Sequence, residues 1–245
     1  MKRLIACAAT AVLTACGGGG SDAVVTPVPA AASAEGFWNG TITGGYGASV
    51  AILENGETWG FYTSGNSLVG ALHGQTSSSN SALTGSGSIF NFVTRQSGSG
   101  TYAGSFVPKS SINFTTNDGA KFTGSYGTTY EQPASLADLA GTYSGFSVTA
   151  TTGAQSIPVT ISTGGAISGS VVSGNLSCSA SGTATPRASG KNIFNVQLSF
   201  SGNFCALGNG ATTAGVAYYD ATSREIGVMT LNSAKTDGLV YIGKR

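Results

Sequence analysis

Charged side chains are scarce in this chain. Its 245 residues include 11 Lys and Arg and 10 Asp and Glu, so that 9% are charged, against about 25% in a typical soluble domain. The net charge of +1 gives no basic footprint for phosphates, which argues against nucleic acid as a partner. Disorder is not expected either, because 40% of the residues are hydrophobic. The 38 glycines have no three-residue period and are accompanied by six prolines, which excludes collagen.

Side chains that carry catalysis are equally few. The chain has one histidine, His73, at a predicted strand end, where a surface or turn position is expected. The sequence contains no Gly-x-Ser-x-Gly, Ser-x-x-Lys or His-Glu-x-x-His pattern. Glu54 and Glu57 flank a predicted hairpin turn and are interpreted as solvated. A hydrolase, the last alternative, would need these carboxylates or His73 to converge in a cleft. We therefore expect no enzyme, no metal and no cofactor.

The N-terminus has the layout of an export signal. Residues 1–3 (Met-Lys-Arg) precede an apolar run over residues 4–13, which is about half the length of a membrane-spanning helix. The run ends in Leu-Thr-Ala-Cys16, which resembles the lipobox of bacterial lipoproteins. The alternative is an ordinary signal peptide with a chance cysteine.

The lipobox resemblance implies that residues 1–15 are removed and that Cys16 carries acyl chains such as palmitate, which suffice for stable membrane anchoring. Gly17 follows the cysteine where an aspartate would stand in retained lipoproteins, and this resembles outer-membrane sorting. We expect a bacterial envelope protein that is anchored to the outer membrane, on its periplasmic face or at the cell surface. Residues 16–34, rich in Gly, Ala and Pro, are predicted to form a flexible tether.

Two further cysteines, Cys178 and Cys205, lie in the body of the chain. An even pair in an oxidising compartment predicts a disulfide. The bond would close a loop of about 28 residues and contribute roughly 3–4 kcal/mol to stability. A metal site would lack histidine partners, and a redox pair would lack the Cys-x-x-Cys spacing.

After Glu35 the hydrophobic pattern has period two, which predicts half-buried strands. The pattern is clearest over residues 194–200, and Asn55-Gly56 predicts a hairpin with a type I′ turn. Regular strand spacing predicts an all-β fold of two tandem antiparallel meanders, as small eight-stranded barrels. The modules span residues 35–127 and 141–245, and a linker with a short helical turn spans 128–140. Strands are expected near 36–43, 48–54, 57–63, 67–74, 82–92, 99–107, 110–116, 120–126, 141–150, 156–162, 165–172, 174–184, 192–201, 211–219, 224–231 and 238–243.

Aromatic residues are the remaining candidates for a binding surface, because rigid rings give contact area at low entropic cost. Neighbouring residues in a strand point to opposite faces, so one member of Phe61-Tyr62 and one of Tyr218-Tyr219 is expected to be exposed. The alternative is that these rings belong to the core. The candidate contact residues are Trp38, Phe61, Tyr62, Tyr218 and Tyr219.

The layout of lipobox, glycine-rich tether and two β modules resembles the surface lipoproteins typified by factor H-binding protein and transferrin-binding protein B. The stretches 215–227 and 238–244 are similar to the last hairpins of their C-terminal barrels. The resemblance implies an envelope-anchored, non-enzymatic binding or structural module, and it transfers no partner and no binding residue. We expect the protein to be a monomer. The alternative is a lipocalin-like carrier of one small apolar ligand. Whether the barrels are filled separates the two, since Phe194, Val196, Leu198 and Phe200 favour a filled core and inward glycines leave room.

Overall fold

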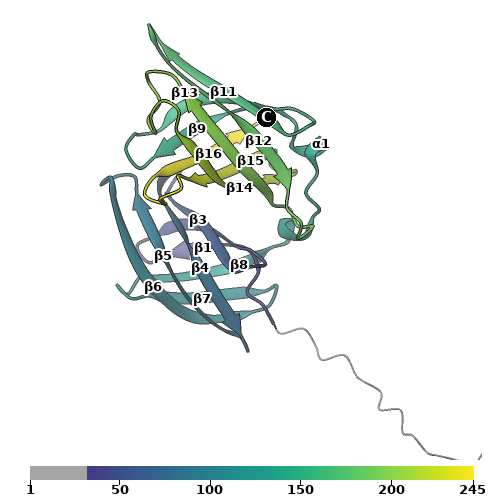
Figure 1. The fold of residues 1–245 in the computed structure, drawn as a ribbon. Helices are drawn as coiled ribbons and strands as arrows, with labels where there is room; N and C mark the ends of the chain where they lie inside the picture. Colours follow the sequence, from purple (N-terminus) through teal and green to yellow (C-terminus); the bar gives the residue numbers. More distant parts are fainter. Residues whose placement is uncertain (1–31) are drawn as a thin grey trace, which may run out of the picture. The chain divides into compact units, whose positions relative to one another are not determined.

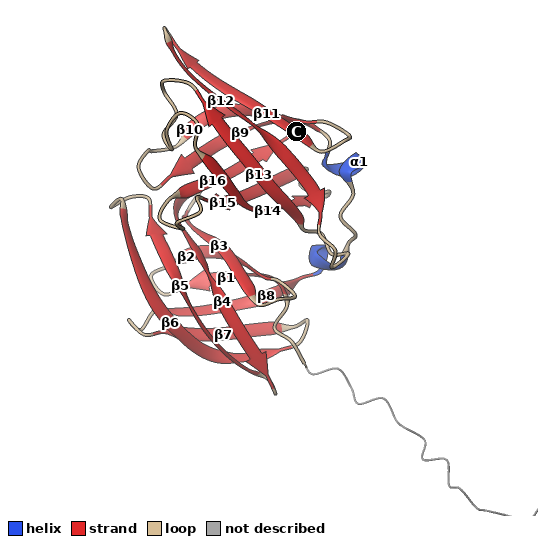
Figure 2. Ribbon diagram, in the orientation of Figure 1, coloured by secondary structure: helices blue, strands red, loops and turns tan. Residues whose placement is uncertain are grey.

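The computed structural model describes residues 32–245. The expected signal peptide, the lipidation site at Cys16 and most of the predicted tether lie outside the described residues. The described part is all-β and consists of two closed antiparallel barrels of eight strands each (Figures 1 and 2). This confirms the predicted fold class. Within residues 32–245, no helix is long and apolar enough to cross a membrane.

The first barrel, called the N-terminal barrel, is a meander in which each strand pairs with the next and the last strand closes on the first. Its strands are β1 (Gly36–Ile42), β2 (Tyr46–Ile52), β3 (Glu57–Ser64), β4 (Ser67–Ser79), β5 (Ala82–Asn91), β6 (Gln96–Val107), β7 (Ser111–Thr116) and β8 (Lys121–Gly127).

The second barrel, called the C-terminal barrel, follows the same plan, with its last strand pairing with its first. Its strands are β9 (Gly141–Thr149), β10 (Gln155–Ile161), β11 (Ala166–Ser173), β12 (Leu176–Pro186), β13 (Phe194–Ser201), β14 (Thr212–Asp220), β15 (Glu225–Leu231) and β16 (Gly238–Lys244). In β13 buried and exposed residues alternate strictly, as the period-two pattern predicts.

The linker contains two short helical segments, η1 (Thr128–Glu131) and α1 (Leu136–Leu139). The Ser135 hydroxyl accepts a hydrogen bond from the backbone N–H of Asp138 at 3.2 Å, which is the N-terminal half of a capping box. Tyr130 of η1 is buried, and its hydroxyl donates to Glu35 Oε1 at 2.8 Å. The linker is thus held against the N-terminal barrel at its start.

The β2–β3 hairpin is present, but its turn differs from the predicted type I′ turn. The N–H of Gly56 donates to the Leu53 carbonyl at 2.8 Å, and the N–H of Leu53 donates to the Glu57 carbonyl at 2.9 Å. Gly56 has a φ of +80°, whereas Asn55 has no positive φ. The connection is a type I turn followed by a left-handed glycine, because Gly56 alone takes the conformation that favours glycine.

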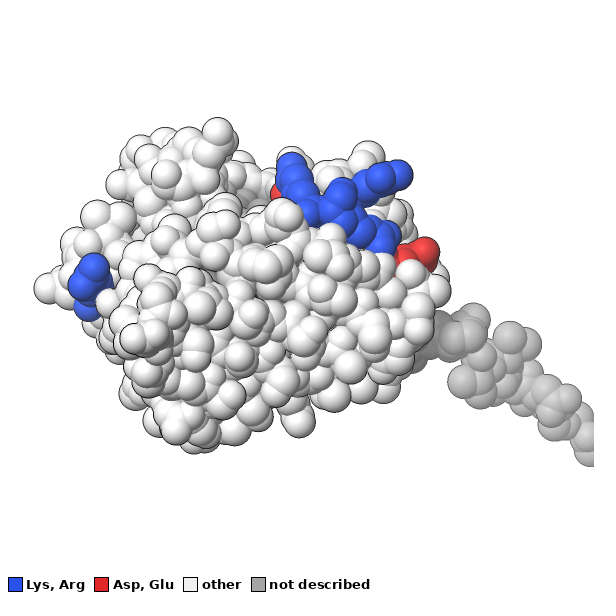
Figure 3. Space-filling model, turned by 90° about the horizontal axis from the view of Figure 1, so that it is seen from above, with Lys and Arg blue, Asp and Glu red and all other residues white. Residues whose placement is uncertain are grey.

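Residues 31–245 form one compact unit, and the outer faces of the two barrels share a hydrophobic cluster. Trp59 and Phe61 of β3 belong to this cluster together with Met229 of β15 and Val240 of β16. Strand β15 is buried from Ile226 to Thr230 without alternation, as expected of a strand covered on both faces. The remaining surface is poor in charge, and Figure 3 shows a face on which most atoms belong to uncharged residues.

Candidate functional site

The interior of the N-terminal barrel is hollow. A cavity of about 940 Å³ lies within it, inside the range of about 300–1,000 Å³ that small-molecule sites occupy. The walls that face it on β4, β5 and β6 carry glycine at several inward positions, where no side chain fills the space. These glycines are Gly74, Gly87, Gly98 and Gly100. Gly98 is exposed and lies near the mouth, and a Cβ atom there would meet no atom within 4 Å, so this stretch of the wall borders the open end of the cavity.

The cavity opens at the end of the barrel that carries the β1–β2, β3–β4, β5–β6 and β7–β8 turns. Residues in or next to these turns line it, among them Thr43, Ser64 and Thr94. Three large apolar side chains that also line it are exposed, namely Tyr46 (38%), Ile89 (37%) and Val93 (71%). The mouth therefore presents apolar surface to solvent, which is typical of an entrance for an apolar molecule.

The other end of the barrel is closed by buried side chains. Trp38 is fully buried, and its indole N–H donates to the carbonyl of Ala34 at 2.9 Å. The N–H of Ala34 donates in turn to Ser78 Oγ at 3.0 Å. Ala34 is itself fully buried, so the end of the predicted tether is part of the barrel plug. Leu83 of β5 and Ile112 of β7 belong to the same buried cluster.

Aromatic rings line the wall between mouth and plug. The rings of Tyr102 and Phe114 lie 5.0 Å apart, those of Phe114 and Phe122 4.9 Å apart, and those of Tyr46 and Tyr62 6.1 Å apart. The Tyr102 ring covers Gly85 of the neighbouring strand so closely that a Cβ there would overlap it. Burial, with the nearby Tyr46, raises the pKa of Tyr62. The Tyr62 phenol is therefore a neutral hydrogen-bonding group at ordinary pH.

Three hydroxyl groups form a chain across this wall. Thr58 Oγ1 donates to the Gly56 carbonyl at 3.0 Å and lies 2.6 Å from Thr76 Oγ1. Thr76 Oγ1 lies 2.6 Å from the Tyr102 hydroxyl. Thr58 and Thr76 are buried, and all three residues line the cavity. Other polar residues line the cavity at strand ends near the mouth, among them Ser64, Asn91 and Gln96. The hydroxyl chain is a polar feature with two buried members, and it could orient a bound molecule.

Charged groups stand at the rim of the cavity. Asp118 and Lys121 line it, in the β7–β8 turn and directly after it. Asp118 is engaged by the Thr116 hydroxyl and the Ala120 N–H, and these hydrogen bonds lower its pKa. His73 also lines the cavity, but its ring nitrogen is paired with Glu57. In the part of the chain that the structure describes, no group of three His, Cys, Asp or Glu residues could hold a metal ion.

The expectation for His73 is wrong. It lies in the middle of β4, not at a strand end, and is 8% exposed. Its ring packs edge-on against Trp59 at 4.4 Å, and its Nε2 lies 3.2 Å from Glu57 Oε1. The hydrogen bond from His73 lowers the pKa of Glu57.

The carboxylates at the hairpin are also paired, where solvated side chains were expected. Glu54 does not join His73, because its Oε1 accepts from Arg187 Nε at 2.7 Å instead. Glu57 takes His73 as its partner. The structure therefore brings Glu57 and His73 together and leaves Glu54 with Arg187.

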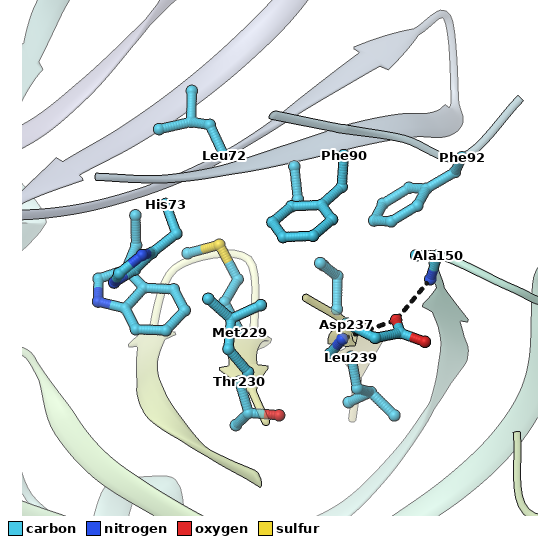
Figure 4. A pocket seen from close by; sticks show the side chains of 14 residues that line it. Leu72, His73, Phe90, Phe92, Ala150, Met229, Thr230, Asp237 and Leu239 are labelled. Carbon is cyan, nitrogen blue, oxygen red and sulfur yellow. Dashed lines mark hydrogen bonds between the residues drawn. The ribbon is translucent and has the colours of Figure 1, made fainter. Parts of the chain in front are cut away.

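A second cavity lies beside His73, among side chains of both barrels (Figure 4). Its volume is about 20 Å³, which is room for about one water molecule. Leu72, Phe90, Met229 and Leu239 are among its lining residues. This space is a packing defect of the shared hydrophobic cluster, and its size excludes a ligand larger than water.

The predicted aromatic contact residues separate into three groups. Trp38, Phe61 and Tyr219 are buried at 0%, 8% and 5% exposure, so they belong to the core, which was the alternative reading. Tyr218 is half-buried and packs edge-on against Phe37 at 5.4 Å. Tyr62 is half-buried and lines the large cavity. Tyr102 is not among the residues predicted from the sequence, because a tyrosine in an alternating strand carries no signal of what its ring faces.

The disulfide between Cys178 and Cys205 is present, with an S–S distance of 2.02 Å and a Cα–Cα distance of 4.8 Å. It attaches the β13–β14 loop to β12. Leu207 of that loop packs against the interior core of the C-terminal barrel. The cavity left in that barrel has about 70 Å³, so this lumen is filled where the first is hollow.

Comparisons with known proteins give little further information. No family model matches the chain, and neither does any curated protein. A crystal structure of a DUF3598-family protein of unknown function from Nostoc punctiforme aligns with 86% of this chain and 96% of its own, at 10% identity and a TM-score of 0.27. That similarity is too low to support an inference about fold or function.

Proposed function

We propose that this chain is a lipid-anchored, non-enzymatic binding protein of the bacterial envelope that carries a small, largely apolar molecule in its N-terminal barrel. The observation that carries the proposal is the hollow lumen of about 940 Å³. Small-molecule sites bury most of their ligand among apolar and aromatic side chains and use few polar groups for orientation. The lumen, with its aromatic wall and short hydroxyl chain, has this composition.

The envelope location in this proposal is supported by the sequence. The apolar run before Cys16 and the match to a lipobox point to export and acylation. The disulfide fits an oxidising compartment. A carrier of an apolar molecule also benefits from a membrane anchor, because its ligand partitions into lipid and is encountered there.

The anchor is tested by replacing Cys16. Full-length chain and its Cys16→Ser variant would be expressed in a Gram-negative host and fractionated after labelling with a palmitate analogue. We expect label and outer-membrane recovery for the unaltered chain and loss of both in the variant. Recovery of both proteins in the soluble fraction without label would contradict the anchor.

The carrier function is tested by native mass spectrometry. A soluble chain of residues 31–245 retains every described element and needs no detergent. After incubation with an envelope lipid extract and gel filtration, we expect an adduct of one small molecule per chain. The Gly98→Phe variant, which places a ring in the open part of the lumen, should lose the adduct, and Gly153→Phe on an exposed loop should keep it. An adduct that persists in Gly98→Phe would place the ligand elsewhere.

A second candidate is binding of a protein partner through the C-terminal barrel. It is favoured by three exposed apolar side chains around the disulfide-linked loop, Val172 (69%), Leu176 (43%) and Phe204 (37%). Pull-down with residues 31–245 and with a Val172→Ser, Phe204→Ser variant tests it. A partner that is captured by the first and lost by the second would support this candidate.

A further inference from the structure

We propose that the ligand of the N-terminal barrel is a neutral amphiphile whose polar end is a hydrogen-bond donor, an O–H or N–H group, accepted by the Tyr102 hydroxyl oxygen. The inference rests on the proposed carrier function and names the chemical class of its ligand. It follows from the direction of the hydroxyl chain and from the position of charge around the lumen.

The direction of the hydroxyl chain is fixed at its buried end. A backbone carbonyl can only accept, so the bond of 3.0 Å between Thr58 Oγ1 and the Gly56 carbonyl uses the single proton of Thr58. Thr76 must therefore be the donor in its bond of 2.6 Å to Thr58. Its proton is then used as well, and Tyr102 must be the donor in its bond of 2.6 Å to Thr76.

The hydroxyl chain therefore presents lone pairs to the lumen and has no free proton to donate. Each hydroxyl has one donor and two acceptor sites, and all three protons point toward the Gly56 carbonyl. The Tyr102 oxygen stands at the open end of the chain and lines the cavity. A ligand hydroxyl or amide N–H would complete it. A ligand that can only accept would face lone pairs and lose its own hydration without replacement.

The positions of the charged residues around the lumen indicate that the ligand is neutral. The charged side chains that line the lumen, Asp118 and Lys121, stand at the β7–β8 rim. Tyr102 pairs with Thr116 beside that rim, but its ring crosses Gly85 of β5 in the opposite direction and places its hydroxyl 2.6 Å from Thr76 Oγ1 on β4. A carboxylate or ammonium group placed at Tyr102 would be buried without a partner of opposite charge, which is strongly unfavourable. Long-chain alcohols, monoacylglycerols and sterol-like alcohols have the required chemistry, whereas ionised fatty acids do not.

The test compares matched probes that differ in one atom group. Residues 31–245 would be loaded with the neutral fluorophore N-phenyl-1-naphthylamine, and 1-dodecanol, dodecyl methyl ether and laurate would compete at pH 8. The ratio of alcohol to ether affinity, compared between variants, reports the hydrogen bond that the alcohol donates. The hydrophobicity of each probe is the same for every variant and cancels in this comparison. Laurate is expected to compete at least about 10-fold more weakly than the alcohol.

Two substitutions change the hydroxyl chain in opposite ways. Tyr102→Phe keeps the ring on Gly85 and Phe114 but removes the acceptor, so the alcohol-to-ether ratio should fall about 2- to 10-fold. Thr76→Val removes the partner of the Tyr102 proton, which frees that proton for the ligand and shifts the preference toward the ether. Tyr218 packs against Phe37 outside the lumen, so Tyr218→Phe is the matched control and should leave the ratio unchanged.

The outcomes separate the two proposals. Failure of every probe to bind would overturn the carrier function itself. Binding with a ratio that neither Tyr102→Phe nor Thr76→Val changes would overturn the present inference and leave the carrier function standing. Laurate binding as tightly as dodecanol would overturn the assignment of a neutral ligand.

Discussion

The two barrels have the same strand number and the same meander topology, yet one is hollow and the other is filled. The N-terminal lumen has about 940 Å³ and the C-terminal lumen about 70 Å³. The difference lies in the inward positions. In the C-terminal barrel, β13 directs Phe194, Val196, Leu198 and Phe200 into the core, whereas glycines stand at many inward positions of β4–β6. Barrel topology therefore does not determine whether a lumen can take a ligand.

The two barrels also differ in whether their ends are open or closed. The mouth of the N-terminal barrel is open and exposes Val93 and Tyr46. In the C-terminal barrel the β13–β14 loop, fixed by the disulfide, places Leu207 against the core. The described part of the N-terminal barrel contains no disulfide of its own. A filled barrel gains stability from its core and its covalent link, while a hollow barrel gives up part of that stability for a binding site.

The largest effect is expected from the disulfide. Replacing Cys178 and Cys205 by alanine should lower the free energy of unfolding by about 3–4 kcal/mol, because the unfolded chain regains the entropy of a loop of about 28 residues. Urea denaturation followed by circular dichroism measures the loss. Probe binding in the N-terminal barrel, measured before the transition, should be unchanged. A loss below about 0.5 kcal/mol would show that the loop is held by its packing alone.

A pair of identical substitutions compares the two interiors directly. Leu198→Ala in the filled barrel should cost about 2–5 kcal/mol, since it creates a void in a packed core. Leu72→Ala on the wall of the hollow barrel should cost about 1 kcal/mol, because Leu72 is half-buried and borders space that already exists. Both values come from urea denaturation. Equal costs would mean that the N-terminal lumen is packed like a core in solution.

A smaller effect concerns Glu131, which joins residues of both halves. Its carboxylate pairs with Lys191 at 2.8 Å and Lys109 at 2.9 Å. Hydrogen bonds from Lys191, Tyr126 and Lys109 lower the pKa of Glu131 to about 2. A lowered folded-state pKa gives stability that is present above the unfolded value of 4.5 and is lost as pH falls toward 2.

For this partly exposed network we expect a contribution of about 0.2–1 kcal/mol. Comparing the unaltered chain with Glu131→Gln between pH 6 and about pH 2 measures it. The difference between the two proteins should shrink toward the acid end. A difference that stays constant over this range would show that ionisation of Glu131 does not contribute.

The smallest effect on stability is expected from a substitution that adds a side chain to the wall of the lumen. Gly98→Phe should change the free energy of unfolding by less than about 0.5 kcal/mol, because a side chain there enters open space. Thermal denaturation beside Gly153→Phe, on an exposed loop, provides the control. A loss of more than about 2 kcal/mol for Gly98→Phe would indicate overpacking, and hence a smaller lumen than the structure contains.

Much of the fold could be predicted from the sequence, because strands with one buried face follow a period of two. Residues 194–200 gave a correct prediction for this reason. The disulfide was predicted on a different ground, the even cysteine pair in an oxidising compartment, and is confirmed. The placement of His73 failed because Gly74 suggested a strand end, while β4 continues to Ser79. Gly74 stands inside the strand where the Ser86 carbonyl would lie 2.4 Å from a Cβ.

The lumen itself was not predictable, although inward glycines were recognised as leaving room. A glycine in a strand is compatible with a bend, a close approach of two strands or an empty space. Gly104 faces a carbonyl at 1.9 Å from its Cβ position, whereas Gly98 faces nothing within 4 Å. Both lie on the same face of β6, so only the three-dimensional arrangement separates them. The direction of the hydroxyl chain also depends on distances that no sequence pattern contains.

The central claim, that one barrel is a binding site and the other is not, is tested most directly by titration of residues 31–245 with N-phenyl-1-naphthylamine. We predict saturation at one probe per chain, loss of binding in Gly98→Phe and full binding in Gly153→Phe and in the double cysteine variant. Saturation at two probes per chain, or binding that survives Gly98→Phe, would contradict the claim.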